Sequence, residues 1–96
     1  MIASFGDQAT EDLYHGRHTS RARRFPQDIR QRVLRKLDML DAAIKIEDLR
    51  SPPGNRLESL GGNLEGFHSI RVNEQWRIIL RWSGSDAYDV ALTDYH

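Results

Sequence analysis

The sequence predicts a single α+β domain in which helices cover one face of an antiparallel sheet. The chain has 96 residues, a length that typically forms one domain around one hydrophobic core. Apolar residues recur at helical spacing in the first half and at every second position in the second half. The two halves meet at residues 51–55, Ser-Pro-Pro-Gly-Asn, which break any regular element.

The N-terminal segment, residues 1–5, is short and apolar and is suited to an edge strand. Asp7 or Thr10 can cap a short helix that runs through Tyr14 and ends at Gly16. Residues 17–24 contain no apolar side chain except that of an alanine, so we expect a mobile basic loop there.

Positive charge is concentrated in residues 15–36, although the whole chain is formally neutral. This segment carries eight basic side chains against one acid, Asp28. Such a concentration indicates a surface that faces a polyanion, and the alternative is a solvated helix face. The candidate contacts are Arg17, Arg21, Arg23, Arg24, Arg32 and Lys36.

A long helix is predicted from Pro26, a residue that the first helical turn tolerates, to about residue 44. Its apolar stripe consists of Ile29, Val33, Leu37, Leu40 and Ile44.

Three strands follow, with a further strand expected at residues 55–60. Even-numbered positions carry the apolar side chains, so the odd-numbered positions form a largely polar face. The apolar face is expected to hold Ile70, Val72, Trp76, Ile78, Leu80, Trp82, Tyr88, Val90 and Leu92. By the same alternation, we interpret His68 as a packing residue.

The registers of the two hairpins follow from this alternation. A three-residue loop at residues 73–75 pairs Val72 with Trp76, and therefore places Arg71 opposite Arg77. With no obvious acid between them, these arginines would form a phosphate-binding pair on the polar face.

In the second hairpin, residues 83–86 form the loop, and Trp82 can pair with Tyr88. That register places Arg81 opposite Asp89, so Arg81 has a structural explanation as half of an ion pair. It also places Arg77 opposite Thr93.

The last strand leads into Asp94-Tyr95-His96. Histidine titrates near neutrality and is the usual general acid or base. If the native protein ends at His96, its α-carboxylate favours the imidazolium form.

Composition excludes several classes of protein. There are no cysteines, so a disulfide scaffold and a thiolate metal site are excluded. His15 and His18 have helical spacing but no third ligand, which argues against zinc. We find no signal peptide or membrane span and expect a cytosolic protein without a cofactor.

Four motifs carry a resemblance to a known family. They are Leu-Asp-Met-Leu-Asp-Ala-Ala at residues 37–43, Ser-Pro-Pro-Gly-Asn-Arg-Leu-Glu at 51–58, Ser-Ile-Arg-Val-Asn-Glu-Gln-Trp-Arg at 69–77, and Asp-Tyr-His at 94–96. Over nearly its full length, the chain resembles the HigB toxins of the RelE/ParE superfamily. The resemblance implies a β-α-α-β-β-β fold, ribosome-dependent mRNA cleavage, and neutralisation by a co-encoded helix-turn-helix antitoxin of the HigA type.

Carried over by motif, the family's catalytic group falls on residues 94–96 and its phosphate-binding arginines fall on Arg71 and Arg77. Glu58 stands where some relatives have a histidine, and a carboxylate can act as a base but not as a cationic phosphate ligand. For the six candidate basic contacts named above, the expected polyanion is RNA or the ribosome, and operator DNA is a further expected partner through the antitoxin complex.

A mechanism without a metal follows, because RNA supplies its own nucleophile, the 2′-OH beside the scissile phosphate. The two arginines would stabilise charge on the phosphate, and His96 would be the general acid. Asp94 or Glu58 would be the base, and Tyr95 would stack on a base or orient the phosphate. Two alternatives are an inhibitor of DNA gyrase, as in the ParE branch, and a plain DNA-binding module.

Overall fold

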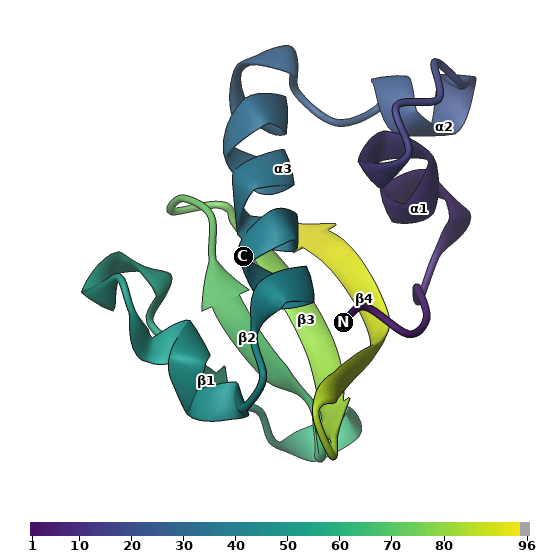
Figure 1. The fold of residues 1–96 in the computed structure, drawn as a ribbon. Coiled ribbons are helices and arrows are strands. Elements are labelled where there is room, and N and C mark those ends of the chain that lie inside the picture. The colour runs from purple at the N-terminus through teal and green to yellow at the C-terminus, as the bar shows by residue number, and fades with distance from the viewer. Residues whose placement is uncertain (95–96) are drawn as a thin grey trace.

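The structure, a computed structural model, describes residues 1–94, so the expectations for Tyr95 and His96 lie outside the described residues. The α-helices are α1 (Gln8–Tyr14), α2 (Ser20–Arg23) and α3 (Gln27–Ala42), and the 3₁₀ helices are η1 (Ile46–Arg50), η2 (Pro53–Asn55) and η3 (Gly62–Leu64). The strands are β1 (Glu58–Ser59), β2 (His68–Arg71), β3 (Trp76–Ser83) and β4 (Asp86–Asp94). Figure 1 shows their arrangement.

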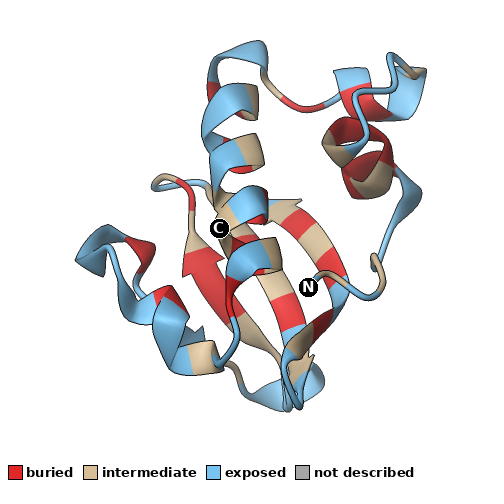
Figure 2. Ribbon diagram, in the orientation of Figure 1, coloured by how far each residue is buried: buried red, intermediate tan, exposed pale blue. Residues whose placement is uncertain are grey.

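The four strands form an antiparallel sheet in the order β1-β2-β3-β4. Helix α3 lies across one face of this sheet, and α1 lies beside the C-terminal end of β4 (Figure 1). Buried residues recur along β2, β3 and β4 (Figure 2), and they form one core cluster with the buried residues of α3. Leu37 and Leu40 from α3, with Ile78 and Leu80 from β3, are fully buried in this layer. The predicted α+β fold is confirmed, and we call the side of the sheet away from α3 the open face.

Helix α3 begins and packs as its apolar stripe predicted, but it ends earlier. Ile29, Val33, Leu37 and Leu40 are buried, whereas Ile44 is 74% exposed, so its predicted place in the core is wrong. The backbone becomes extended at Ala43, and the side chain of Ala43 is buried in place of that of Ile44. Because the helix has ended, its 3.6-residue periodicity no longer predicts which side chain is buried at position 44.

The β2–β3 hairpin has the predicted register. Arg71 pairs with Arg77, and the backbone N–H of Val72 donates to the carbonyl of Trp76 at 2.9 Å. The side chain of Asn73 accepts hydrogen bonds from the backbone N–H groups of Gln75 and Trp76. This Asx-type bonding is why a polar three-residue loop closes the hairpin here.

The predicted pairing of Arg77 with Thr93 is confirmed, but the β3–β4 hairpin departs from its predicted register nearer the turn, because β4 contains a bulge. Arg81 pairs with Tyr88 and Trp82 with Ala87, with the register shift between Ile79 and Arg81. One extra residue inverts the alternation: Ala87 is buried and Tyr88 is 38% exposed, so the predicted core position of Tyr88 is wrong. The predicted ion pair nevertheless forms, with Arg81 Nε 3.5 Å from Asp89 Oδ2.

The N-terminal segment runs parallel to β4 through two isolated bridges, Ile2 with Ala87 and Phe5 with Val90. A side chain at Gly6 would place its Cβ 2.8 Å from the carbonyl oxygen of Asp89, so only glycine allows this close approach. The predicted edge strand is therefore a bridged segment. The strand expected at residues 55–60 shrinks to β1, because η2 occupies its beginning.

Residues 17–24 do not form the expected irregular loop. They contain α2, whose Thr19 cap accepts a hydrogen bond from the backbone N–H of Ala22. Ala22 is only 4% exposed, so even this single apolar side chain is buried. The short helix packs against α1, and contacts with the buried carboxylate of Asp12, described below, fix the segment.

Candidate functional site

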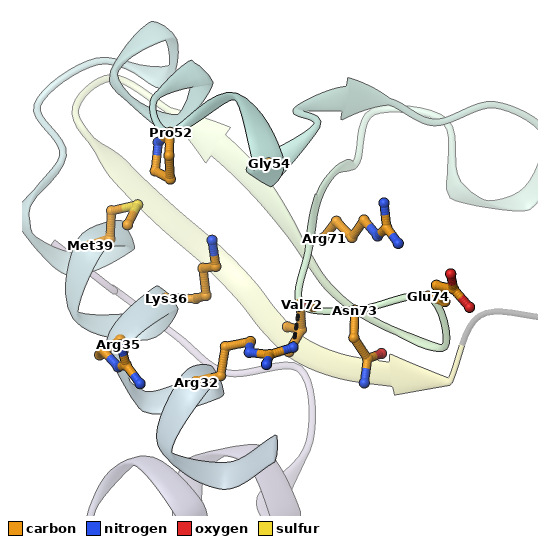
Figure 3. A pocket seen from close by; sticks show the side chains of 10 residues that line it. All are labelled: Arg32, Arg35, Lys36, Met39, Pro52, Gly54, Arg71, Val72, Asn73 and Glu74. Atoms are coloured by element: carbon orange, nitrogen blue, oxygen red, sulfur yellow. Dashed lines mark hydrogen bonds between the residues drawn. The ribbon is translucent and has the colours of Figure 1, made fainter. Parts of the chain in front are cut away.

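A cationic cleft of about 550 Å³ lies between α3, the turn at residues 52–54 and the β2–β3 loop (Figure 3). It is lined by Arg32, Arg35, Lys36, Met39, Pro52, Gly54, Arg71, Val72, Asn73 and Glu74. Four of these side chains are cationic and one is a carboxylate. Such a lining favours an anionic ligand.

Lys36 points from α3 into the cleft, toward the turn that carries Pro52 and Gly54 (Figure 3). Its Nζ donates a hydrogen bond to Oδ1 of Asn55. Partial burial lowers the pKa of Lys36, and the neighbouring charges of Arg32 and Arg35 lower it further. A bound anion would offset that repulsion.

Asn55 is fully buried and fixes the position of Lys36. Its Nδ2 donates to the carbonyls of Leu49 at 3.0 Å and Ser51 at 3.3 Å, which leaves Oδ1 turned toward the lysine. From the sequence, Asn55 was expected only to end the breaker at residues 51–55 and to begin the strand at residues 55–60. Its contact with Lys36 depends on burial, which no local sequence pattern indicates.

The remaining cations stand on both sides of the cleft. Arg32 reaches across from α3 and donates to the carbonyl of Val72 at 3.4 Å. Arg71 extends from β2 on the side away from α3 (Figure 3). Arg35, which was not among the predicted contacts, also lines the cleft. Arg71, at the end of β2, therefore stands between the cations of the cleft and Arg77 of β3.

On the open face, Arg77 forms an ion pair with Glu58, with Nη1 3.5 Å from Oε1. The side chain of Arg77 is 13% exposed and that of Glu58 is 49% exposed. Arg77 also donates to the hydroxyl of Ser69 at 3.1 Å. The expectation that no acid stands by the two arginines is therefore wrong for Arg77. The reason is the pairing of β1 with β2, which places Glu58 opposite Ser69.

Asp94 lies at the same end of the sheet. It pairs with Trp76, one position beyond the pairing of Arg77 with Thr93. Its carboxylate accepts a hydrogen bond from Gln75 Nε2 at 3.2 Å. The structure therefore brings four predicted site residues, Arg71, Arg77, Glu58 and Asp94, to one end of the sheet.

The other predicted contacts lie in what we call the α1–α2 corner, residues 17–24 together with Asp12. Arg17 and Arg21 form ion pairs with Asp12 at 3.2 and 3.3 Å, and Asp12 is 1% exposed. Hydrogen bonds from Gln8 and Thr19, with those from the two arginines, hold the pKa of Asp12 far below its usual range.

Arg23 and Arg24, also in the α1–α2 corner, are exposed. Each donates to a backbone carbonyl, those of His18 and Arg21 respectively. The predicted set of RNA contacts is thus divided between the corner and the cleft.

Residues 1–94 contain no group of three or more histidine, aspartate or glutamate side chains placed to hold a metal ion. No helix within them is both long and apolar enough to span a bilayer.

Comparison with known proteins identifies the class of protein. Residues 3–96 match the family model of the RelE-like toxin of type II toxin-antitoxin system HigB. The chain is 48% identical to Toxin HigB-1 of Vibrio cholerae over 82 residues, which cover 85% of this chain and 84% of that protein. It is 33% identical to Endoribonuclease HigB of Proteus vulgaris over the full length of both chains. The chain therefore belongs to the HigB-like family of type II toxins.

Solved structures show the same fold. The YoeB-YefM complex of Staphylococcus aureus contains a chain with a TM-score of 0.61 and 16% identity, with coverage of 100% of this chain and 98% of that chain. The YoeB/ParE toxin of Agrobacterium tumefaciens has a TM-score of 0.56 and 18% identity, and both chains are fully covered.

Proposed function

We propose that this protein is an endoribonuclease that inhibits translation by cutting mRNA on the ribosome. The family membership and the naming of one full-length relative as an endoribonuclease support an activity on RNA. The observation that carries the proposal is the grouping of Arg71, Arg77 and Glu58 at the end of the sheet that leads into Asp94. Two cations beside a carboxylate base are what metal-free cleavage at a phosphodiester requires.

In the proposed reaction, a carboxylate takes the proton of the ribose 2′-OH, and the 2′-oxygen attacks the adjacent phosphorus. Arg77 and Arg71 stabilise the charge on the non-bridging oxygens. The bond to the 5′-oxygen breaks, and that oxygen receives a proton from the general acid. The products are a 2′,3′-cyclic phosphate and a 5′-hydroxyl end, and no metal takes part.

We assign the base to Glu58 and retain Asp94 as the alternative. Glu58 is half exposed and sits 3.5 Å from Arg77, so an incoming phosphate that binds this arginine arrives beside the carboxylate. Asp94 is at the same end of the sheet. The general acid is His96, and Tyr95 stacks on an unpaired base or orients the phosphate. Both assignments rest on the motif at residues 94–96.

In this proposal, the cationic cleft binds the RNA next to the cleavage site. Lys36, Arg32 and Arg35 lie on the α3 side of the cleft and Arg71 on the β2 side, so phosphates next to the cut can be neutralised as the RNA strand passes the end of β2. We further propose that a co-encoded helix-turn-helix antitoxin holds the toxin inactive in the cytoplasm. Arg23 and Arg24 are proposed to contact ribosomal RNA, or operator DNA within the antitoxin complex.

The test is to add the purified protein to a translating extract and to map the mRNA ends. We expect new 5′-hydroxyl ends matched by 2′,3′-cyclic or 3′-phosphate ends, in wild type but not in Arg77→Ala. A 3′-hydroxyl product would contradict the 2′-OH mechanism. Since ribosomes need magnesium, chelator is added together with replacement magnesium, which tests for a requirement for any other metal, and cleavage should survive it. Intact mRNA combined with inhibited supercoiling by DNA gyrase would favour the gyrase inhibitor instead.

A further inference from the structure

The open face carries a recess near the β3–β4 turn, at the other end of β4 from Asp94, that the proposed reaction does not use. This bulge pocket has a volume of about 450 Å³ and is lined by Gly66, Arg81, Trp82, Ser83, Tyr88 and Asp89. Tyr88 is 38% exposed, which makes it one of the large hydrophobic side chains exposed on the surface. An accessible aromatic ring beside an arginine in a recess is a common arrangement for holding a nucleic-acid base.

The β-bulge creates this pocket. Asp89 has a φ of 54°, a left-handed conformation that side chains other than glycine seldom adopt. The bulge turns Tyr88 to the open face, directly opposite Arg81, where strict alternation would have buried it. The N-terminal segment holds the bulge in place, since the Ser4 hydroxyl accepts from the backbone N–H of Asp89 at 2.8 Å. A supported, unusual backbone that exposes an aromatic ring points to a binding role.

Arg81 is positioned for planar stacking. Its guanidinium carbon lies 4.4 Å from the centre of the Phe67 ring, and its Nε lies 3.5 Å from Asp89 Oδ2. These two contacts hold the guanidinium over the Phe67 ring, while Tyr88 pairs with Arg81 from the next strand. Arginine planes and tyrosine rings both accept nucleic-acid bases of any sequence.

The pocket is in line with the proposed cleavage site. Arg77 and Arg81 lie on the same face of β3, four residues apart, which corresponds to about 13 Å along a strand. Arg71, opposite Arg77, continues the same row of cations toward the cleft. A single RNA strand that crosses Arg77 along β3 therefore reaches the bulge pocket.

We propose that the bulge pocket binds an unpaired base of the RNA strand, stacked on Tyr88 and Arg81, on the side of the cut away from the cationic cleft. This inference rests on the proposed function, because it extends the path of the same RNA. The pocket adds a sequence-tolerant contact that positions the strand across Arg77. It is a binding contact and takes no part in the proton transfers.

The probe is a single-stranded RNA decanucleotide with 2′-O-methyl groups, so that it cannot be cut, and with 2-aminopurine as a fluorescent base. Binding to wild type at low salt should quench the fluorophore, which reports stacking. Tyr88→Ala should weaken binding about 5- to 150-fold, the range found when one base loses its aromatic partner, and should abolish the quenching. Tyr88→Phe keeps the ring and should retain both.

Leu64→Ala is the matched control, since Leu64 is 37% exposed and lies on η3, outside the pocket. Melting temperatures of all variants separate lost binding from lost folding. Unchanged affinity in a folded Tyr88→Ala protein overturns the pocket, and so does a wild type that does not bind the probe at low salt. If the same wild-type preparation still cuts mRNA in the extract, the proposed function stands without the pocket. Failure of both cleavage and binding removes both proposals.

Discussion

The α1–α2 corner and the cationic cleft draw on one basic stretch of sequence, but they use its charges in opposite ways. In the corner, Arg17 and Arg21 are held by the buried carboxylate of Asp12. In the cleft, Lys36 is held by a neutral amide, that of Asn55, and is surrounded by other cations. The corner satisfies the charges of Arg17 and Arg21 internally, whereas the cleft leaves charge for a ligand. Charge density along a sequence therefore does not identify a binding surface until the position of the acids is known.

The largest expected effect is that of removing the imidazole of His96. This variant tests whether the general acid belongs to the motif at residues 94–96. His96→Ala should lower the rate of mRNA cleavage by roughly 10²–10⁴-fold, the usual effect of removing a positioned proton donor. Its melting temperature and its affinity for the antitoxin should equal those of wild type. Cleavage at a comparable rate would show that the general acid is elsewhere.

A variant of Arg77 tests whether the scissile phosphate binds on the open face, beyond the cleft. Arg77→Ala should lower the cleavage rate by about 10²–10³-fold, because it removes a charge that stabilises the transition state. Glu58→Gln and Asp94→Asn then separate the two candidate bases, since only the variant that lacks the base should lose activity at saturating substrate. Equal losses in both carboxylate variants would mean that neither acts alone as the base.

Asp12 tests the structural role of the corner. Asp12→Asn should lower the melting temperature at neutral pH, since it leaves Arg17 and Arg21 without their shared partner. The lowered pKa of Asp12 fixes the sign of the pH dependence. The stabilisation is complete above the pKa of an unfolded aspartate, about 3.9, and is lost as the pH falls from there toward the pKa of the folded state.

The difference in stability between wild type and Asp12→Asn should therefore narrow below about pH 4. Thermal unfolding from pH 2.5 to 7 measures it, and Asp28→Asn, an exposed acid on α3, is the control. A constant difference across this range would mean that the carboxylate's charge is not what stabilises the corner.

Much of the fold was predictable because periodic burial imposes it. The stripe of α3 and the pairing of Arg71 with Arg77 followed from apolar spacing alone. The β-bulge was not predictable, since the residue that inverts the alternation at Tyr88 is an aspartate held in an unusual conformation by the distant Ser4. Alternation along a strand holds only while the ladder is regular.

The sequence predicted which residues form the candidate site, but not which side chains they contact. Arg71, Arg77 and Glu58 were named from strand alternation and family motifs, and the structure brings them to one end of the sheet. The ion pair between Arg77 and Glu58 depends on β1, a strand only two residues long. Asn55 escaped notice because its role depends on burial, which a Pro-Pro-Gly context does not reveal.

One comparison tests the central claim that the cleft binds RNA and the corner supports the fold. Lys36→Gln/Arg71→Gln and Arg17→Gln/Arg21→Gln each remove two positive charges, and glutamine at position 36 can still donate to Asn55. The affinity for an uncleavable single-stranded RNA is measured against salt concentration, together with the melting temperature. The cleft variant should lose about 0.7 of the log–log salt slope for each phosphate contact removed, with an unchanged melting temperature. The corner variant should melt earlier with an unchanged slope, and a flattened slope in the corner variant alone would contradict the account.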